Sequence, residues 1–457
     1  MLFGKSQPKL HLLHRRFNQG DFAGRQIQCT FAKPSMISER PATPTAFRRK
    51  STAKREAELM TIDLFCGAGG IAEGFRGEGF RCLYGNDVMA EAIQTFALNH
   101  PDAIADCRPI EDVNAAEIRE RLKLAPGELD VLVGGPPCQG FSINAPERFL
   151  SDPRNKLFQH YARFVREFQP KAFLFENVSG ILSMDDGKVF QQILKVFTDL
   201  GYEVSVKILF AAHYGAPQER WRLILLGSKS GEIAHPLPTH FAKGRANFRG
   251  GATLTFQLDD ALRAALPTAV TVGDAISDLP LRLMGEGAEE LNYTKPTTSA
   301  YALRMRNLTG VTFNHYAAKL GPQNIERMKH VPPGGSWRDI PHDLLPAGMQ
   351  KARKSDHTKR YGRLHPDRLS GTVLTKCDPH WGSVFLPTQD RALTVREAAR
   401  FQSFPDHYRF LGSRVSQYEQ VGNAVPVVMA AAVARSIREH LSAAMKTTES
   451  VALVACG

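Results

Sequence analysis

The stretch "DLFCGAGGIAEGF" (Asp63–Phe75) decides the fold, because an apolar strand in it runs directly into a cluster of glycines. Gly67 and Gly69, with Ala72, fit the pattern G-x-G-x-x-A. Glycines of this kind let a ligand approach the backbone at the N-terminus of a helix. Asp87 lies twenty residues after Gly67, where an acid accepts hydrogen bonds from ribose hydroxyls. The pattern predicts a turn that binds an adenosine-containing cofactor, and a tight structural turn is the alternative.

Outward from this turn, short apolar strands alternate with amphipathic helices. We expect strands at 61–65, 82–86, 130–135, 172–177, 203–210 and 222–227, and helices at 88–100, 155–168 and 189–200. The alternation predicts an α/β fold with a doubly wound, parallel sheet. In such sheets, catalytic and ligand-binding groups lie at the carboxyl ends of the strands.

The alternation stops near residue 235, which predicts a second, smaller domain. Residues 236–390 are rich in Gly, Pro, Thr and basic residues, and they show few periodic segments. Helices are expected again at 393–404 and 423–441, and the second of these has an apolar face that can pack on the first domain. We therefore expect a first domain at 59–235, completed by 411–457, and a loop-rich domain at 236–410.

The N-terminal segment carries most of the net charge of +12. Residues 1–55 hold twelve Lys and Arg against two acids, so about +2 remains for the rest of the chain. Residues 1–58 are interpreted as a basic, disordered tail. An extension upstream of a true start at Met60 and an organellar transit peptide are the alternatives. Since the body is nearly neutral, charge alone is poor evidence for a nucleic-acid partner.

The cysteine count argues against disulfides and metal sites. Seven cysteines are scattered along the chain, and none forms a C-x-x-C pair. This excludes a disulfide framework and a zinc ribbon as simple interpretations, and no metal-ligand cluster is visible. No apolar run reaches the length needed to span a bilayer, so no membrane segment is expected. A cytoplasmic protein without a metal is the prediction.

The stretch "VLVGGPPCQGFS" (131–142) holds one cysteine rigidly at the end of a predicted strand. Pro136 and Pro137 restrict the backbone directly before Cys138. A free cysteine is usually a small, inert hydrophobic residue, which is the alternative here. A buried core thiol needs no such rigid lead, so Cys138 is our candidate nucleophile.

Charged side chains follow at the ends of two further strands. Glu176, in "FENVSG", ends an apolar strand at the same edge as Cys138, where it is either a structural acid or an acid–base group. Arg220 and Arg222, in "GAPQERWRLILLG", lie two apart and so point to one face of a strand. The two arginines either form a surface salt bridge or orient Glu176 or a bound base and phosphate. In "YEQVGNAVP" (418–426), Asn423 is placed at the start of the last helix, where a simple cap explains it almost as well.

Taken together and in this order, "DLFCGAGG", "GGPPCQGFS", "ENVSG", "PQERWR" and "QVGNAVP" resemble the motifs of DNA (cytosine-5) methyltransferases. The stretches at 271–280, 332–341 and 391–406 look like the same family, so that the resemblance covers roughly residues 60–440. It implies a Rossmann-like, S-adenosylmethionine-dependent methyltransferase domain and a smaller target-recognition domain.

The resemblance also implies roles for individual residues. Cys138 matches the catalytic nucleophile, Glu176 the acid that contacts N3 of the target cytosine, and Arg220 and Arg222 the arginines of a Q-x-R-x-R motif opened by Gln218. The residues implied to bind S-adenosylmethionine are Phe65, Gly67, Gly69, Asp87, Asp106, Asn423 and Val425. Phe65 would lie beside the adenine, and Asp106 stands in "ADCRPI" where the family usually has Gly-Asp-Ile.

The implied substrate is double-stranded DNA, from which one cytosine is flipped out and methylated at C5. The implied enzyme is a monomer and the modification member of a restriction–modification system, with a cognate endonuclease that shares its site. Three other functions are alternatives. A thiol-dependent NAD dehydrogenase does not explain "ENV", a tRNA cytosine-5 methyltransferase is the closest alternative, and an inactive DNA-binding module does not explain Cys138 and Glu176.

Overall fold

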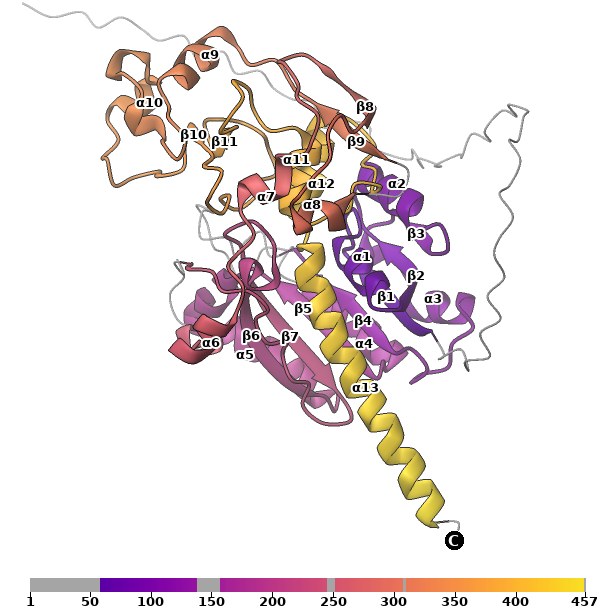
Figure 1. The fold of residues 1–457 in the computed structure, drawn as a ribbon. Helices are drawn as coiled ribbons and strands as arrows, with labels where there is room; N and C mark the ends of the chain where they lie inside the picture. The colour runs from indigo at the N-terminus through magenta and orange to yellow at the C-terminus, as the bar shows by residue number, and fades with distance from the viewer. Residues whose placement is uncertain (1–57, 138–156, 245–250, 307–309, 456–457) are drawn as a thin grey trace, which may run out of the picture. The chain divides into compact units, whose positions relative to one another are not determined.

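The computed structural model describes residues 58–137, 157–244, 251–306 and 310–455, all within the compact unit Arg55–Gly457 (Figure 1). A seven-stranded sheet organises its first part, in the order β3-β2-β1-β4-β5-β7-β6. The strands are β1 Leu59–Leu64, β2 Phe80–Asn86, β3 Ile104–Asp106, β4 Val131–Gly134, β5 Ala172–Asn177, β6 Glu203–Phe210 and β7 Trp221–Ser228. The predicted strands are all present, and β3 is additional.

The doubly wound α/β class is confirmed, but the prediction that every strand runs parallel is wrong for one of them. Strand β7 is antiparallel to both β5 and β6, while β1 to β5 pair in parallel. The reason is the short connection between β6 and β7, residues 211–220. A parallel crossover needs a dozen or more residues, so this pair closes as a hairpin.

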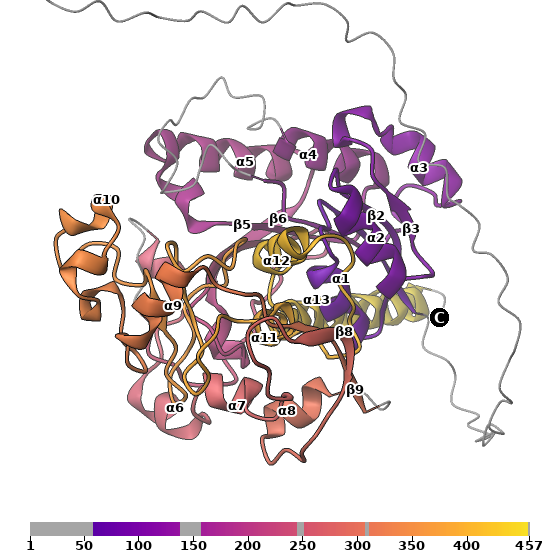
Figure 2. The same cartoon turned by 90° about the horizontal axis from the view of Figure 1, so that it is seen from above.

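Helices cover both faces of the sheet, as the alternation predicts (Figures 1 and 2). On β5, Phe173 and Phe175 face the helices α3 Ala115–Arg121, α4 Leu157–Phe168 and α5 Lys188–Asp199. Ala172 and Leu174 face the opposite layer, formed by α1 Gly70–Gly77 and α13 Val427–Ala455. A further helix, α2 Ala90–Asn99, packs beside β2 and β3. Because both faces are covered, strands of this kind are apolar throughout.

The last helix and the turn before it pack on α1 at two of its glycines. A Cβ added at Gly74 would lie 2.6 Å from the Cβ of Ala430, and one at Gly70 would lie 2.7 Å from the carbonyl oxygen of Val425. The two backbones therefore come together only because these positions lack side chains. This confirms the expected return of the C-terminal helix.

The start of that helix is a correction to the sequence analysis. Asn423 ends helix α12, Arg414–Asn423, and α13 begins only at Val427. Pro426 explains the break, because a proline disfavours helical geometry in the residue before it and donates no backbone hydrogen bond. Asn423 is thus the last residue of α12, and Val425 lies in the turn between the two helices.

Loops and short elements make up most of the chain between β7 and α11. The helices are α6 Asp260–Ala265, α7 Val272–Ile276, α8 Ala300–Met305, α9 Pro322–Lys329, α10 Ala347–Gln350 and α11 Val395–Phe401. The strands are β8 Gly287–Asn292, β9 Val311–Tyr316, β10 Gly362–Arg363 and β11 Ser383–Phe385. The loop-rich character agrees with the composition, whereas the boundaries 236 and 410 stay a prediction.

Buried arginines hold α11 in place. The Arg400 side chain is fully buried, and it forms ion pairs with Asp278 at 2.8 Å and with Asp406 at 2.5 Å. Burial opposes ionisation of Asp278, but the charges and hydrogen bonds of Arg400 and Arg306 outweigh it and lower the pKa of this carboxyl. Arg400 thereby connects segments from both sides of the loop-rich region.

The segment Arg414–Lys446 is long and apolar enough to cross a membrane by length and composition, which the sequence analysis did not expect. However, 72% of its most apolar window is buried within the protein. A core helix passes the same test, so its apolar surface is explained by packing on the sheet.

Replacing Arg400 by methionine is predicted to lower the free energy of unfolding by about 3–5 kcal/mol, because two buried carboxylates each lose their ion pair with Arg400. Arg263→Met is the matched control, since its ion pair with Asp260 is exposed and should be worth less than about 1 kcal/mol. Urea unfolding followed by circular dichroism measures both. Equal effects of the two substitutions would contradict the structural role of the buried pair.

Candidate active site

The carboxyl ends of β1, β2 and β3 meet at one edge of the sheet. The backbone N–H of Gly67, after β1, donates to the Asp87 carboxylate at 2.9 Å, and the N–H of Met89 donates to its other oxygen at 2.9 Å. The N–H of Asp87 in turn donates to the carbonyl of Asp106, at the end of β3. Burial raises the pKa of Asp87, while these backbone hydrogen bonds oppose the shift. The structure thus brings four predicted site residues together: Phe65, Gly67, Asp87 and Asp106.

The two glycines of the turn have different reasons to be glycine. Both have positive φ, +52° at Gly67 and +91° at Gly69. A Cβ at Gly67 would meet nothing within 4 Å, whereas one at Gly69 would lie 2.7 Å from the hydroxyl of Tyr408. Gly67 therefore borders open space that a ligand can enter, and Gly69 is required by packing. Phe65, with φ +57°, is partly exposed beside them.

A buried pair supports this turn, and the sequence analysis did not find it. The hydroxyl of Tyr408 donates to the carbonyl of Ala68 and lies 3.2 Å from the ring of His100. Burial, aided by the charge of Arg76, lowers the pKa of His100 to about 3, so the imidazole is neutral near pH 7. The only sequence signal was that Tyr408 stands two residues after the end of the family-like stretch at 391–406.

Asp106 is less available than its predicted role requires. Arg108 forms an ion pair with its carboxylate at 2.8 Å, and the hydroxyl of Tyr84 donates to it at 2.9 Å. Burial opposes ionisation, but the hydrogen bonds from Arg108 and Tyr84 lower the pKa of Asp106. A bound cofactor would share this carboxylate with Arg108, which is partly exposed at the same edge.

The ends of β4 and β5 form the second half of the edge. The Asn177 amide donates to the carbonyl of Pro136 at 3.1 Å, which ties the Pro-Pro lead to the end of β5. A Cβ added at Gly135 would lie 2.6 Å from Oε2 of Glu176, so this glycine makes room for the carboxylate. Cys138 itself lies outside the described residues.

Glu176 is held by an arginine from the neighbouring strand. Its Oε1 lies 2.6 Å from Nε of Arg222, and both side chains are only 13–14% exposed. The pairing follows from the antiparallel register, in which Glu176 opposes Ile224 and the start of β7 reaches the carboxyl edge of β5. This geometry agrees with the interpretation that Arg222 orients Glu176.

Arg220 takes a different position from Arg222. It is 2% exposed, and its guanidinium donates to the carbonyls of Val373 at 3.2 Å and Gly422 at 2.8 Å. Burial lowers the pKa of Arg220, the charge of Arg222 adds to the shift, and Glu176 opposes it. Arg220 thus connects the strand edge to the loop-rich region and to the end of α12.

Two glutamines continue this connection. Gln218 donates to the carbonyl of Phe401 at 2.7 Å and to the side chain of Gln402 at 2.6 Å. Gln402 then donates to the carbonyls of Val421 and Ala424, which flank Asn423. Gln402 was not identified from the sequence, because a glutamine inside a predicted helix carries no distinct signal.

The turn between α12 and α13 lies beside the glycine turn. Val425 is 7% exposed, and its carbonyl faces Gly70 at the start of α1. Asn423 is exposed. Both predicted residues therefore lie in a segment that the structure holds next to the β1 turn.

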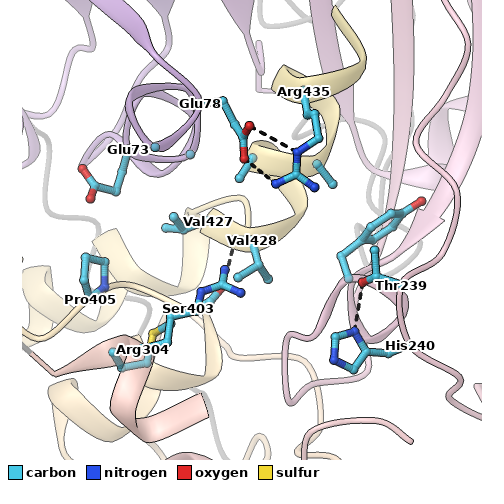
Figure 3. Close-up of a pocket in the computed structure, with 16 residues that line it drawn as sticks. Glu73, Glu78, Thr239, His240, Arg304, Ser403, Pro405, Val427, Val428 and Arg435 are labelled. Carbon is cyan, nitrogen blue, oxygen red and sulfur yellow. Dashed lines mark hydrogen bonds and ion pairs between the residues drawn. The ribbon is translucent and has the colours of Figure 1, made fainter. Parts of the chain in front are cut away.

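A cavity of about 510 Å³ lies elsewhere, between α1, α13 and the segment after β7 (Figure 3). Glu78 and Arg435 form an ion pair on its wall, and Thr239 and His240 lie opposite. None of the described site residues lines it. The cavity is therefore separate from the strand edge.

Comparison with known proteins gives a single family over most of the chain. The family model of the C-5 cytosine-specific DNA methylases matches residues 59–439. Type II methyltransferase M.AgeI of Thalassovita gelatinovora is 38% identical over 437 residues, covering 84% of this chain and 100% of that protein. Type II methyltransferase M1.HphI of Haemophilus parahaemolyticus is 35% identical over 385 residues, covering 83% and 86%.

Solved structures share the fold. A DNA modification methyltransferase encoded within an E. coli prophage superposes with a TM-score of 0.64 at 24% identity, covering 84% of this chain and 99% of that one. The Dnmt2 methyltransferase of S. pombe superposes with a TM-score of 0.51 at 16% identity, covering 84% and 99%.

The two glycines of the turn make a matched pair of variants. Gly67→Ala should cost about 1–2 kcal/mol of stability, since only the left-handed backbone is strained. Gly69→Ala should cost about 2–5 kcal/mol, because a clash with Tyr408 adds to the same strain. Urea unfolding curves of the two variants measure the difference. A loss at Gly67 equal to that at Gly69 would contradict the assignment of open space to Gly67.

Proposed function

The chain belongs to the C-5 cytosine-specific DNA methylase family, and we propose that it methylates C5 of one cytosine within a specific sequence of double-stranded DNA. The enzyme class is DNA (cytosine-5-)-methyltransferase, EC 2.1.1.37. In our proposal the methyl donor is S-adenosylmethionine and the nucleophile is Cys138.

One observation supports this proposal most. The glycine turn with Asp87 and the carboxylate of Glu176 lie at the same edge of one sheet, and the Pro-Pro lead to Cys138 is bonded to that edge through Asn177. The residues that we propose for the donor site follow β1 and β2, Glu176 lies near the end of β5, and the end of β4 lies between them. This is the arrangement that a transfer between two bound molecules requires.

The residues at the first half of the edge fit the adenosine part of the donor. Open space in front of Gly67 permits close approach to the backbone, and Asp87 offers carboxylate oxygens to ribose hydroxyls. The partly exposed ring of Phe65 would lie against the adenine, and Val425 would close the site from the turn before α13. The donor supplies the methyl group as part of a sulfonium ion.

The chemistry needs a covalent step, because C5 of cytosine is too weak a nucleophile to take a methyl group directly. The thiolate of Cys138 forms a bond to C6, the C5–C6 double bond breaks, and its electrons make C5 nucleophilic. C5 then forms a bond to the methyl carbon as the methyl–sulfur bond breaks. A base removes the C5 proton, the C5–C6 double bond re-forms and the Cys138 thiolate leaves.

Glu176 stabilises the ring while Cys138 is attached. Glu176 in its protonated form donates to N3, which offsets the electron density that the thiolate adds. Arg222 fixes the position of the carboxyl group at 2.6 Å, so that little reorganisation is needed when the base arrives. In this role Glu176 is a catalytic residue and Arg222 is a positioning residue.

The substrate in our proposal is duplex DNA rather than a free base. C5 and C6 are stacked inside a duplex, so the target must be flipped out at a cost of about a few kcal/mol. Two relatives are named type II methyltransferases, and we propose the same modification role here, exercised by a monomer in the cytoplasm with a cognate endonuclease that shares its site. Sequence recognition is assigned to the loop-rich region.

Cys138→Ser is predicted to lower methyl transfer by at least about a thousandfold, because serine at this position provides no thiolate. Binding of S-adenosylmethionine should stay within about twofold, since the donor contacts lie at the β1 turn. Transfer of a tritiated methyl group to unmethylated genomic DNA measures the first effect, and titration calorimetry the second.

Cys29→Ser serves as the control, because Cys29 stands in none of the motifs and should leave transfer unchanged. Near-normal transfer by Cys138→Ser would contradict the covalent mechanism. Binding of NAD in place of S-adenosylmethionine would contradict the cofactor.

A further inference from the structure

Trp381 is an exposed aromatic side chain in the loop-rich region. The chain has three tryptophans, of which Trp337 is 5% exposed and Trp381 is 56% exposed. Leu374, 38% exposed, lies next to Gly382, the residue that follows Trp381, because a Cβ added at Gly382 would be 2.9 Å from Cδ1 of Leu374. An exposed apolar side chain is common on its own, so the surroundings of Trp381 decide whether it serves a contact.

Hydrogen bonds hold the backbone around Trp381 in place. Strands β10 and β11 pair in parallel, so the residues that precede them lie side by side (Figure 1). The N–H of Tyr361, before β10, donates to the carbonyl of Pro379, and the N–H of Trp381, before β11, donates to the carbonyl of Asp378. A side chain that is ordered before binding loses less entropy when it binds.

Cationic and polar groups surround the indole. The guanidinium of Arg360 lies 4.8 Å from the centre of the Trp381 ring, and the ring of His380 lies 5.0 Å away, nearly perpendicular. Arg360 also contacts His380 at 3.3 Å. Lys359, next in the chain, is more than half exposed. Aromatic and cationic side chains in such proximity suit a nucleobase and its phosphate better than an apolar protein surface.

A short path of contacts joins Trp381 to the candidate active site. Leu374, which packs on Gly382, presents its carbonyl to Gly422 so closely that a Cβ there would collide with it. The carbonyl of Gly422 accepts a hydrogen bond from Arg220, and Arg222 beyond it holds Glu176. Trp381 therefore lies in the part of the loop-rich region that packs against the end of α12 held by Arg220.

We propose that Trp381 stacks on a nucleobase of the DNA next to the target cytosine. This inference rests on the proposed function, and it names a residue that binds the duplex at the site where a base leaves the stack. Removal of one base exposes the faces of its neighbours, and an aromatic ring that covers such a face replaces the lost stacking. Arg360 supplies a positive charge at the same point, for the phosphate of that nucleotide.

The test compares Trp381→Ala, Trp381→Phe and Met445→Ala in the full-length protein. Met445 is the matched control, because it is 54% exposed near the end of α13, on a segment that forms no part of the strand edge. The probe is a fluorescein-labelled duplex carrying the site at which base-resolution mapping finds 5-methylcytosine after treatment of genomic DNA with the wild-type enzyme. Binding is measured by anisotropy, transfer with tritiated donor, and stacking by quenching of tryptophan fluorescence.

Trp381→Ala should bind and methylate this duplex about 5- to 100-fold less well, whereas Trp381→Phe, which keeps an aromatic ring, should stay within about threefold. Wild-type fluorescence should fall when unlabelled duplex is added, and Trp381→Phe should lose most of that change. Trp381→Ala values equal to those of Met445→Ala, or quenching that persists in Trp381→Phe, would overturn the inference.

The two proposals fail in different ways. If the wild-type protein transfers no methyl group to DNA, the proposed function fails, and quenching by fragments of genomic DNA, which needs no mapped site, decides whether Trp381 stacks on a base. If the wild type is active and the Trp381 variants behave like the control, only the inference about Trp381 fails.

Discussion

The ion pair between Glu176 and Arg222 is the contact on which the candidate site depends. It exists because β7 runs antiparallel to β5, so that the first residues of β7 reach the edge where β5 ends. In a parallel arrangement Arg222 would lie at the opposite edge, and the carboxylate of Glu176 would be buried without a cation, which is costly. The antiparallel direction of β7 is thus also what holds the carboxylate of Glu176 in position. Gly135 leaves the space that this acid occupies.

Buried polar contacts then hold three parts of the chain together at this edge: the start of β7, the loop-rich region with α12, and the glycine turn. Arg220 and Gln218, before β7, reach backbone carbonyls of the loop-rich region and of α12. Tyr408 supports the glycine turn from the other side. Polar groups buried in this way are costly unless every partner is in place, so they favour one relative arrangement of the segments. Such an arrangement is what keeps the proposed donor site and the proposed base site at a fixed distance from each other.

The sequence was most informative at positions where a single physical requirement explains the residue type. Apolar runs located the strands, the glycine pattern and its spacing identified Gly67 and Asp87, and Glu176 was identified because strand ends share an edge. The direction of β7 was missed because an apolar strand looks the same in either direction, and only the short connection at 211–220 distinguishes them. Asn423 was placed at a helix start because the effect of Pro426 was not considered. Tyr408 and Gln402 act through contacts between residues far apart in the chain, which no local pattern records.

The central claim is that Cys138 bonds transiently to C6 of a flipped cytosine. The most direct test uses a duplex with 5-fluorocytosine at the methylated position, together with S-adenosylmethionine. Fluorine at C5 cannot leave as a proton does, so release of the thiolate is blocked. We predict a stable protein–DNA adduct that depends on the donor and that mass spectrometry assigns to the peptide containing Cys138. An active preparation that forms no adduct, or one attached through another residue, would contradict the claim.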